Sequence, residues 1–185
     1  MKYIKDIENY KPYNEHEIMD KQLILNFIQN NSDHLYRENL AGHITSSAIV
    51  INQDKTKVLF AYHNIYDSWG WVGGHNDGDD DLLKVAIKET KEETGIKEVK
   101  PYLEDIYMLD VIYVENHIKN GKLVPDHLHL NVTYLLIADD TQILKVKEDE
   151  NQAVAWIELE DVFNKISEPR MVPIYKKAFD KLKAI

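Results

Sequence analysis

The sequence contains no cysteine and no long apolar run among its 185 residues. The lack of cysteine excludes disulfide scaffolds, thiolate metal sites and any mechanism that uses a Cys nucleophile or acid. No uninterrupted apolar stretch exceeds five residues, which is far too short to span a membrane. The first residues also lack the apolar segment of a signal peptide. We therefore expect a cytoplasmic protein without a membrane partner.

Positive charge is also scarce. Lys and Arg total 22 against 32 Asp and Glu, which gives a formal net charge of -10. A surface of this sign does not attract the phosphate backbone of duplex nucleic acid, so we expect no such partner. The remaining composition, 44% hydrophobic and 29% charged, is that of an ordinary globular domain with a sizeable core.

The N-terminal residues predict a helix. Asn14 followed by Glu17 is a typical helix start, and apolar residues recur at helical spacing after it: Met19, Leu23, Ile24, Phe27 and Ile28. We expect a helical extension over residues 1–40 that packs on a domain formed by residues 41–185. Three roles for the extension remain open: it packs on the domain, forms part of a homodimer, or caps a cleft.

Strand-like and helical patterns alternate in the rest of the chain. Strands are predicted near residues 44–51, 58–62, 106–114, 128–138 and 154–159, and helices near 81–94 and 174–182. This alternation indicates an α/β or α+β fold with a mixed β-sheet.

Residues 81–94 carry an unusual cluster of carboxylates. Glu89, Glu92 and Glu93 fall within roughly a 100° arc of the helix, although like charges at this spacing destabilise a helix by about 0.2–0.5 kcal/mol per pair. A divalent cation would offset this cost, and oxygen ligands favour Mg²⁺ or Mn²⁺ over zinc. The alternative is a solvated acidic face neutralised by nearby lysines, namely Lys84, Lys88 and Lys91.

The same segment resembles the Nudix box, a loop-helix-loop motif of 23 positions. The residues that match in register are Gly74, Glu89, Glu92, Glu93, Gly95 and Ile96. Three positions depart from the motif: Asp80 stands for a Glu, Lys88 for an Arg, and Thr90 for an apolar residue. Lys88 can hold the adjacent Glu as a point charge only, because it lacks the planar fork of Arg.

The resemblance implies a Nudix α/β/α sandwich that cleaves a nucleoside diphosphate linked to another moiety by water attack at phosphorus. It places Mg²⁺ or Mn²⁺ on Glu89, Glu92 and Glu93, with the Gly73 carbonyl as a further ligand. The implied general base is Glu92 or Glu93, or else a glutamate on a later loop, for which Glu150 is our candidate and Glu148 a substitute. The alternative for Glu150 is one charge in a solvated run.

Residues that flank the box or lie on a later strand are candidates for substrate binding. Gly74 and His75 are expected near a phosphate, and Trp69 could stack on a nucleobase. His129 lies on the polar face of the 128–138 strand and could donate a hydrogen bond to the substrate. The alternatives are a solvated loop for His75 and a hydrated sheet face for His127 and His129.

Two functions of different classes therefore remain. The first is a metal-dependent pyrophosphohydrolase acting on a nucleotide-like diphosphate. The second is a Nudix-fold module that binds or senses a nucleotide without turnover. Retention of Glu89, Glu92 and Glu93 favours the enzyme.

Overall fold

The computed structural model describes residues 1–119 and 121–185, and its strands form one large sheet and one small one. The eight-stranded sheet has the order β10-β2-β1-β9-β5, with β3 paired to β2, β4 to β1 and β6 to β9. Its strands are β1 (Gly42–Ile51), β2 (Lys57–His63), β3 (Ser68–Gly70), β4 (Val72–His75), β5 (Val99–Pro101), β6 (Met108–Val114), β9 (His127–Ala138) and β10 (Asn151–Glu158). The two-stranded sheet pairs β7 (His117–Lys119) with β8 (Lys122–Val124).

The chain divides into two compact units. The first comprises residues 1–47, 73–86 and 104–134, and the second comprises 48–72, 87–103 and 135–185. Strands β1 and β9 and helix α3 (Leu82–Thr94) each contribute residues to both units.

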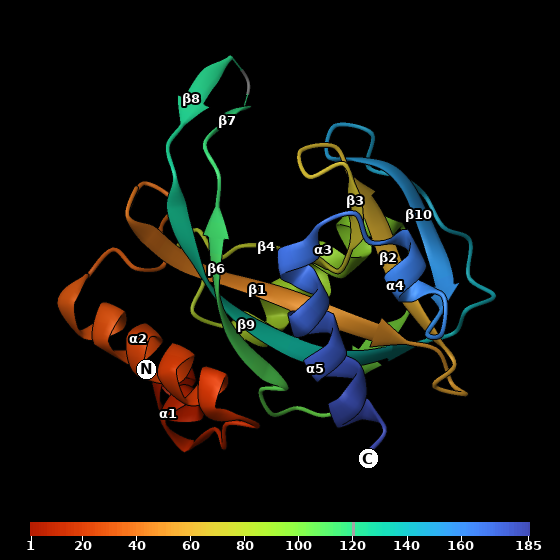
Figure 1. The fold of residues 1–185 in the computed structure, drawn as a ribbon, viewed down its shortest axis with the longest axis horizontal. Helices are drawn as coiled ribbons and strands as arrows, with labels where there is room; N and C mark the ends of the chain where they lie inside the picture. Colours follow the sequence, from red (N-terminus) through yellow and green to blue (C-terminus); the bar gives the residue numbers. More distant parts are fainter. Residues whose placement is uncertain (120) are drawn as a thin grey trace. The chain divides into compact units, whose positions relative to one another are not determined.

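In the first unit, α1 (Lys2–Asn9) and α2 (Glu15–Asn30) precede the sheet strands, and α2 packs on β6 (Figure 1). Asn14 caps α2 as predicted, because its Oδ1 accepts the Glu17 backbone N–H at 2.9 Å. Strand β6 pairs antiparallel with β9, from Met108 opposite Thr133 to Val114 opposite His127. The hairpin of β7 and β8 extends beyond these two strands (Figure 1).

The buried face of α2 differs from the pattern of its apolar residues. Ile24 and Ile28 are buried, but Met19 and Leu23 are exposed, and the fully buried Glu17 takes part in the packing instead. One oxygen of Glu17 accepts the backbone N–H of Tyr13, and the other accepts that of Leu109 on β6. These two hydrogen bonds turn the Glu17 side of the helix toward the strand, which apolar spacing alone could not reveal.

In the second unit, β2 lies between β10 and the second half of β1, all antiparallel, and β5 pairs with the second half of β9. The C-terminal elements are α4 (Val162–Lys165), the 3₁₀ turn η1 (Pro169–Met171) and α5 (Val172–Leu182). Tyr175 of α5 is almost fully buried, and its ring lies 5.0 Å from Phe60 and 5.4 Å from Trp71, measured between centroids. These rings form part of an apolar core in this unit.

The five strands and the three helices predicted from periodicity are all present with small shifts of their ends. Strands β3, β4, β5, β7 and β8 were not predicted, because segments of three or four residues are too short to show a period of two. Helix α1, of eight residues, lies within the predicted helical extension but was not singled out. None of the described helices is both long and apolar enough to cross a membrane.

Candidate functional site

The C-terminal half of α3 presents the carboxylates that the sequence singled out. The helix ends at Thr94, and Gly95 follows in a left-handed conformation with φ of 73°. A Cβ at Gly95 would also lie 2.6 Å from the Cβ of Lys145, so both backbone and space require glycine. The helix end predicted at Gly95 is therefore confirmed.

The sequence places Leu83, Ala86, Ile87 and Thr90 on the arc of α3 that adjoins the acidic face. Ala86 and Thr90 are buried, but Leu83 and Ile87 are only half-buried. Further residues complete the buried side: Leu82, Val85, Glu93 and Thr94. The acidic and buried sides thus overlap at Glu93.

Two of the three glutamates converge on one ammonium group. Lys88 Nζ donates to Glu89 Oε1 at 3.0 Å and to Glu92 Oε2 at 3.1 Å. The hydrogen bond with Glu89 raises the pKa of Lys88, and the bond with Glu92 adds to this effect against partial desolvation. Glu89 is largely enclosed, with 13% of its side chain exposed, whereas Glu92 is 45% exposed. Lys88 thus holds both carboxylates at once.

Glu93 has different surroundings. It is 2% exposed, and its Oε2 accepts a hydrogen bond of 3.0 Å from Asn151 Nδ2 at the start of β10. An enclosed carboxylate of this kind is costly unless it is paired or bound to a cation. Asn151 was not singled out in the sequence, since a lone amide beside an acidic run gives no signal.

Glu150 lies one residue before Asn151 and forms an ion pair with Lys147. Lys147 Nζ lies 2.9 Å from Glu150 Oε2. Although desolvation opposes it, this bond, together with the charges of Glu150 and Glu89, raises the pKa of Lys147. Lys147 therefore lies within the electrostatic influence of both carboxylates. The role predicted for Glu150 as a general base stays a prediction.

The donor set on α3 fits a hard divalent cation. All three side chains offer carboxylate oxygens, and two of them already point to one cationic atom, Lys88 Nζ. Mg²⁺ and Mn²⁺ prefer such oxygens, supplemented by waters and substrate phosphate oxygens. Lys88 occupies only one oxygen of each carboxylate, which leaves the other for a metal.

The glycine loop belongs to the first unit, where Gly73 lies against β1. A Cβ at Gly73 would lie 2.5 Å from Ser47 Oγ and 2.6 Å from the Ser46 carbonyl oxygen. Only glycine permits this close backbone approach. The roles predicted for the Gly73 carbonyl as a metal ligand and for Gly74 in substrate binding stay predictions.

The two tryptophans before the loop differ in burial. Trp71 is 9% exposed, accepts a hydrogen bond from the His63 ring on its carbonyl and packs edge-on against Tyr175. Trp69 is only half-buried and lies edge-to-face with Tyr62, with a centroid separation of 5.6 Å. Trp71 is therefore a core residue, and Trp69 keeps the exposure that base stacking needs.

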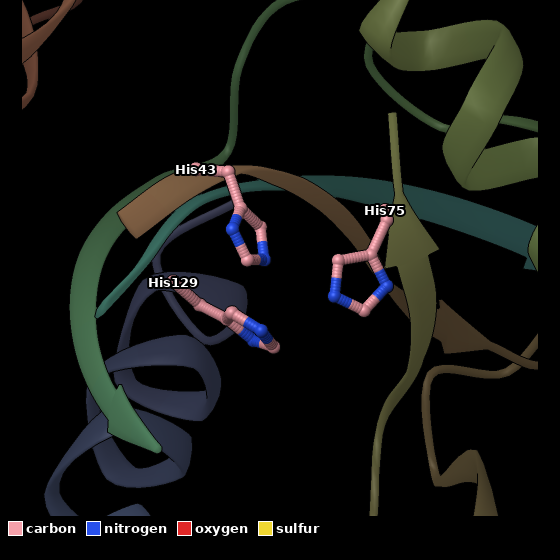
Figure 2. A group of neighbouring side chains, drawn as sticks. All are labelled: His43, His75 and His129. Carbon is pink, nitrogen blue, oxygen red and sulfur yellow. The ribbon is translucent and has the colours of Figure 1, made fainter. Parts of the chain in front are cut away.

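A group of histidines in the first unit was only partly foreseen. His75 ends β4 and His129 lies on β9, and both face His43 at the start of β1 (Figure 2). The ring centroids lie 4.9 Å apart for His43 and His75, and 5.1 Å apart for each of the other two pairs. His127 joins this group, at 5.0 Å from His129 and 5.1 Å from His43.

The sheet face that carries these rings is largely buried, so a hydrated face is wrong for His127, and for His129 it stays open. His127, Asn131 and Thr133 are buried, and His129 is half-buried. Asn131 Oδ1 accepts hydrogen bonds from the hydroxyls of Thr45 and Ser47 on β1. Alternating polar side chains of β1 and β9 therefore satisfy each other, which the strand pattern of β9 alone could not show.

Burial lowers the pKa of two histidines of this face, which favours their neutral form. Desolvation lowers the pKa of His43, with a smaller contribution from His127. Desolvation also holds the pKa of His129 well below its usual range, and His75, His43 and His127 act in the same direction. Neutral imidazoles can donate one hydrogen bond and offer one lone pair.

His43 was missed in the sequence. The signal was available, because His43, Thr45 and Ser47 alternate on β1 in the same way as His127, His129 and Asn131 on β9. The partner strand and the position of His75 could not be read from either pattern.

Comparison with solved structures shows the fold. An Ap4A hydrolase from C. elegans, solved as a binary complex, has a TM-score of 0.56 at 20% identity, over 77% of this chain and 98% of that one. A NUDIX-family hydrolase from Clostridium perfringens has a TM-score of 0.55 at 20% identity, over 76% and 97%. The NUDIX domain of Shewanella oneidensis NrtR, in complex with ADP ribose, has a TM-score of 0.54 at 17% identity, over 85% and 97%.

At these identities the likeness establishes the α/β/α sandwich with its mixed sheet, as predicted. No curated protein sequence matches the chain. The family model for the NUDIX domain, however, matches residues 42–182, which is most of the sequence and includes all of the box. The chain therefore belongs to the NUDIX domain family.

Proposed function

We propose that the protein is a divalent-metal-dependent pyrophosphohydrolase that cleaves a nucleoside diphosphate linked to another moiety. The observation that carries this proposal is the arrangement on α3. Glu89, Glu92 and Glu93 occupy one turn and a half of helix, and Lys88 gathers two of them. An acidic protein of net charge -10 can bind an anionic substrate through cations held by such carboxylates.

The ligands proposed for Mg²⁺ or Mn²⁺ are Glu89, Glu92, Glu93 and the carbonyl of Gly73. When bound, the cation lowers the pKa of the attacking water and neutralises charge on the phosphate oxygens. The residues of the chain hold and orient the reacting groups. Lys88 positions Glu89 and Glu92, and Asn151 positions Glu93 through its amide.

The proton of the attacking water needs an acceptor. Glu92 and Glu150 are 45% and 38% exposed, so water reaches both carboxylates. Glu93 is 2% exposed and already accepts from Asn151, which suits a fixed ligand better than a proton acceptor. We therefore assign the general base to Glu92 or to Glu150, and the ligand role to Glu93.

The substrate class is a nucleotide-like diphosphate. Trp69 supplies a half-buried ring for a base, and Gly74, His75 and His129 are the proposed contacts to phosphate. The C. elegans protein is an Ap4A hydrolase, and the Shewanella NUDIX domain was solved with ADP ribose. Both compounds contain an adenosine phosphate group joined through a phosphoanhydride. We therefore propose Ap4A and ADP ribose as the first two compounds to test as substrates of this chain. A cytoplasmic location, a domain boundary near residue 40 and a homodimer stay predictions.

The test is a panel of nucleoside diphosphate derivatives with Mg²⁺ or Mn²⁺, followed by chromatography of the nucleotide products. We expect at least one derivative to be cleaved at the phosphoanhydride in a metal-dependent way. Glu92→Gln should abolish turnover and leave the fold intact, whereas Glu98→Gln, at an exposed position after the helix, should retain it. Full activity in Glu92→Gln would refute the assigned role.

One observation favours a second candidate, a module that binds a nucleotide without turnover. Lys88 already neutralises part of the negative charge on Glu89 and Glu92. A site that binds a nucleotide without cleaving it needs no catalytic metal on these glutamates, so this ion pairing is compatible with such a module. Calorimetric titration of the same panel separates the two functions. Saturable binding without products across the panel would support the module and contradict the enzyme.

A further inference from the structure

The histidine group defined by His43, His75 and His129 is built like a metal site. Each residue offers one ring nitrogen, and these three atoms all lie within 4.8 Å of one another. Three different strands supply them, β1, β4 and β9, and the rings face a common point (Figure 2). All three strand segments belong to the first unit, whereas the box glutamates belong to the second.

His43 provides an independent sign that this group of side chains can accept a ligand. The residue is 3% exposed, and its Nε2 is buried without a hydrogen-bond partner among the described residues. Its Nδ1 donates to the Asn39 carbonyl oxygen at 3.2 Å, so the proton of the neutral ring lies on Nδ1. Nε2 therefore carries a lone pair that is directed into the group, and leaving it unpaired is costly.

The hydrogen bonds of His127 fix the tautomer of His129 as well, with the proton on the other ring nitrogen. His127 Nδ1 donates to the Pro125 carbonyl oxygen at 2.8 Å, so its Nε2 is an acceptor in the neutral ring. That Nε2 lies 3.2 Å from His129 Nε2, which must then be the donor. The remaining nitrogen of His129, Nδ1, keeps its lone pair. Backbone carbonyls commonly orient metal-binding histidines in this way.

We propose that His43, His75 and His129 bind a transition-metal ion of the Zn²⁺ class. Three imidazoles without a carboxylate or thiolate favour Zn²⁺, and also Cu²⁺, Ni²⁺ or Fe²⁺, over Mg²⁺ or Mn²⁺. Three protein ligands leave the fourth tetrahedral position of Zn²⁺ open to water or to an anionic group of a ligand. The site thus differs in metal preference from the oxygen ligands on α3.

The experiment uses the full chain without an affinity tag, stripped with a chelator and dialysed against ZnCl₂ in the presence of excess Mg²⁺. We expect retention of about one Zn²⁺ per chain, measured by atomic emission. Replacement by Co²⁺ should give the visible absorption of nitrogen-bound, low-coordinate Co²⁺. Removing one ligand, in His43→Ala, His75→Ala or His129→Ala, should weaken Zn²⁺ binding by roughly 100-fold or more.

The matched control is His16→Ala. This histidine lies on α2 with 82% of its side chain exposed, so its loss should leave Zn²⁺ binding unchanged. Because His43 is buried, circular dichroism must show that each variant is folded, and His75→Gln supplies a second variant at a half-buried position. Zn²⁺ should also raise the melting temperature of the wild type but not that of the ligand variants.

Three results would overturn the proposal. The first is that the folded wild type retains no Zn²⁺. The second is that all three ligand variants still retain it. The third is that a Glu92→Gln, Glu93→Gln double variant loses Zn²⁺ while His75→Gln keeps it. The last result would place the ion on α3. None of these outcomes depends on turnover, so the hydrolase proposal can fail or succeed separately.

Discussion

The acidic end of α3 and the histidine group hold their polar side chains by opposite means. On α3, lysine hydrogen-bonds charged carboxylates at distances near 3 Å, and solvent still reaches Glu92. In the histidine group, desolvation lowers the pKa of His43 and His129, and backbone carbonyls hold His43 and His127. A lysine compensates the negative charge of the glutamates on α3, whereas burial disfavours positive charge on the histidines. Hard cations such as Mg²⁺ therefore suit the glutamates, and metals that prefer imidazole ligands, such as Zn²⁺, suit the histidine group.

The largest of these effects concerns the enclosed carboxylate Glu93, for which we propose a fixed ligand role. Glu93→Gln removes the charge but keeps the shape and one oxygen for Asn151. We expect kcat/KM on the cleaved substrate to fall by about 10²–10³-fold, the usual loss for a group that stabilises transition-state charge. Steady-state kinetics at saturating Mg²⁺ measures it, with Glu98→Gln as the matched control. A decrease of less than about tenfold would show that Glu93 is not a ligand.

The polar face beside the histidines gives the next effect, on stability. Asn131 is 2% exposed, accepts from the hydroxyls of Thr45 and Ser47, and donates to Thr133 at 2.9 Å. Asn131→Ala leaves these hydroxyls without a partner, so we expect a loss of about 1–3 kcal/mol in the free energy of unfolding.

Urea denaturation measures this loss, and Asn30→Ala on the exposed side of α2 is the matched control, with an expected change within about 0.5 kcal/mol. If Asn131→Ala were no more destabilised than Asn30→Ala, the hydrogen bonds of the β1 and β9 side chains would not be what holds this face.

The contrast between the two regions also explains what the sequence could reveal. The glutamates are neighbours on one helix, so residues 89–93 and the glycines around them carry the pattern locally. The histidines come from positions 43, 75 and 129, and only the pairing of strands brings them together. The helix and strand periodicity of the sequence predicted the main secondary-structure elements. The positions of Asn151 beside Glu93 and of His43 beside His75 depend on contacts between residues far apart in the chain, so the sequence could not reveal them.

A smaller effect on kcat is expected at Lys88, the residue that compensates the charge of Glu89 and Glu92. Lys88→Met removes the ammonium that positions Glu89 and Glu92, and we expect kcat to fall by about tenfold. Lys88→Arg should restore kcat, because its planar fork can hold a carboxylate with two hydrogen bonds.

Kinetics over a range of Mg²⁺ concentrations separates a change in kcat from a change in metal affinity. Lys84→Met is the matched control, since Lys84 pairs with Asp79 rather than with a box glutamate. Equal kcat values for Lys88→Met and the wild type would contradict the positioning role.

The smallest effect tests whether burial alone keeps histidines neutral, and His63 in the second unit allows this outside the histidine group. Desolvation lowers the pKa of His63, against a smaller opposite effect of its hydrogen bond to the Trp71 carbonyl. The unfolded chain therefore binds a proton at higher pH than the folded one, so this contribution to stability is complete above about pH 6.5 and is lost as the pH falls below it. His63→Gln keeps a donor for Trp71 but cannot titrate, so its free energy of unfolding should fall less between about pH 7.5 and about pH 5.5 than that of the wild type.

Urea denaturation across this range measures the difference, with the exposed His16→Gln as control. Parallel pH profiles for His63→Gln and the wild type would mean that desolvation of a single histidine does not govern its charge in this protein, and the neutrality of the histidine group would then depend on its mutual contacts.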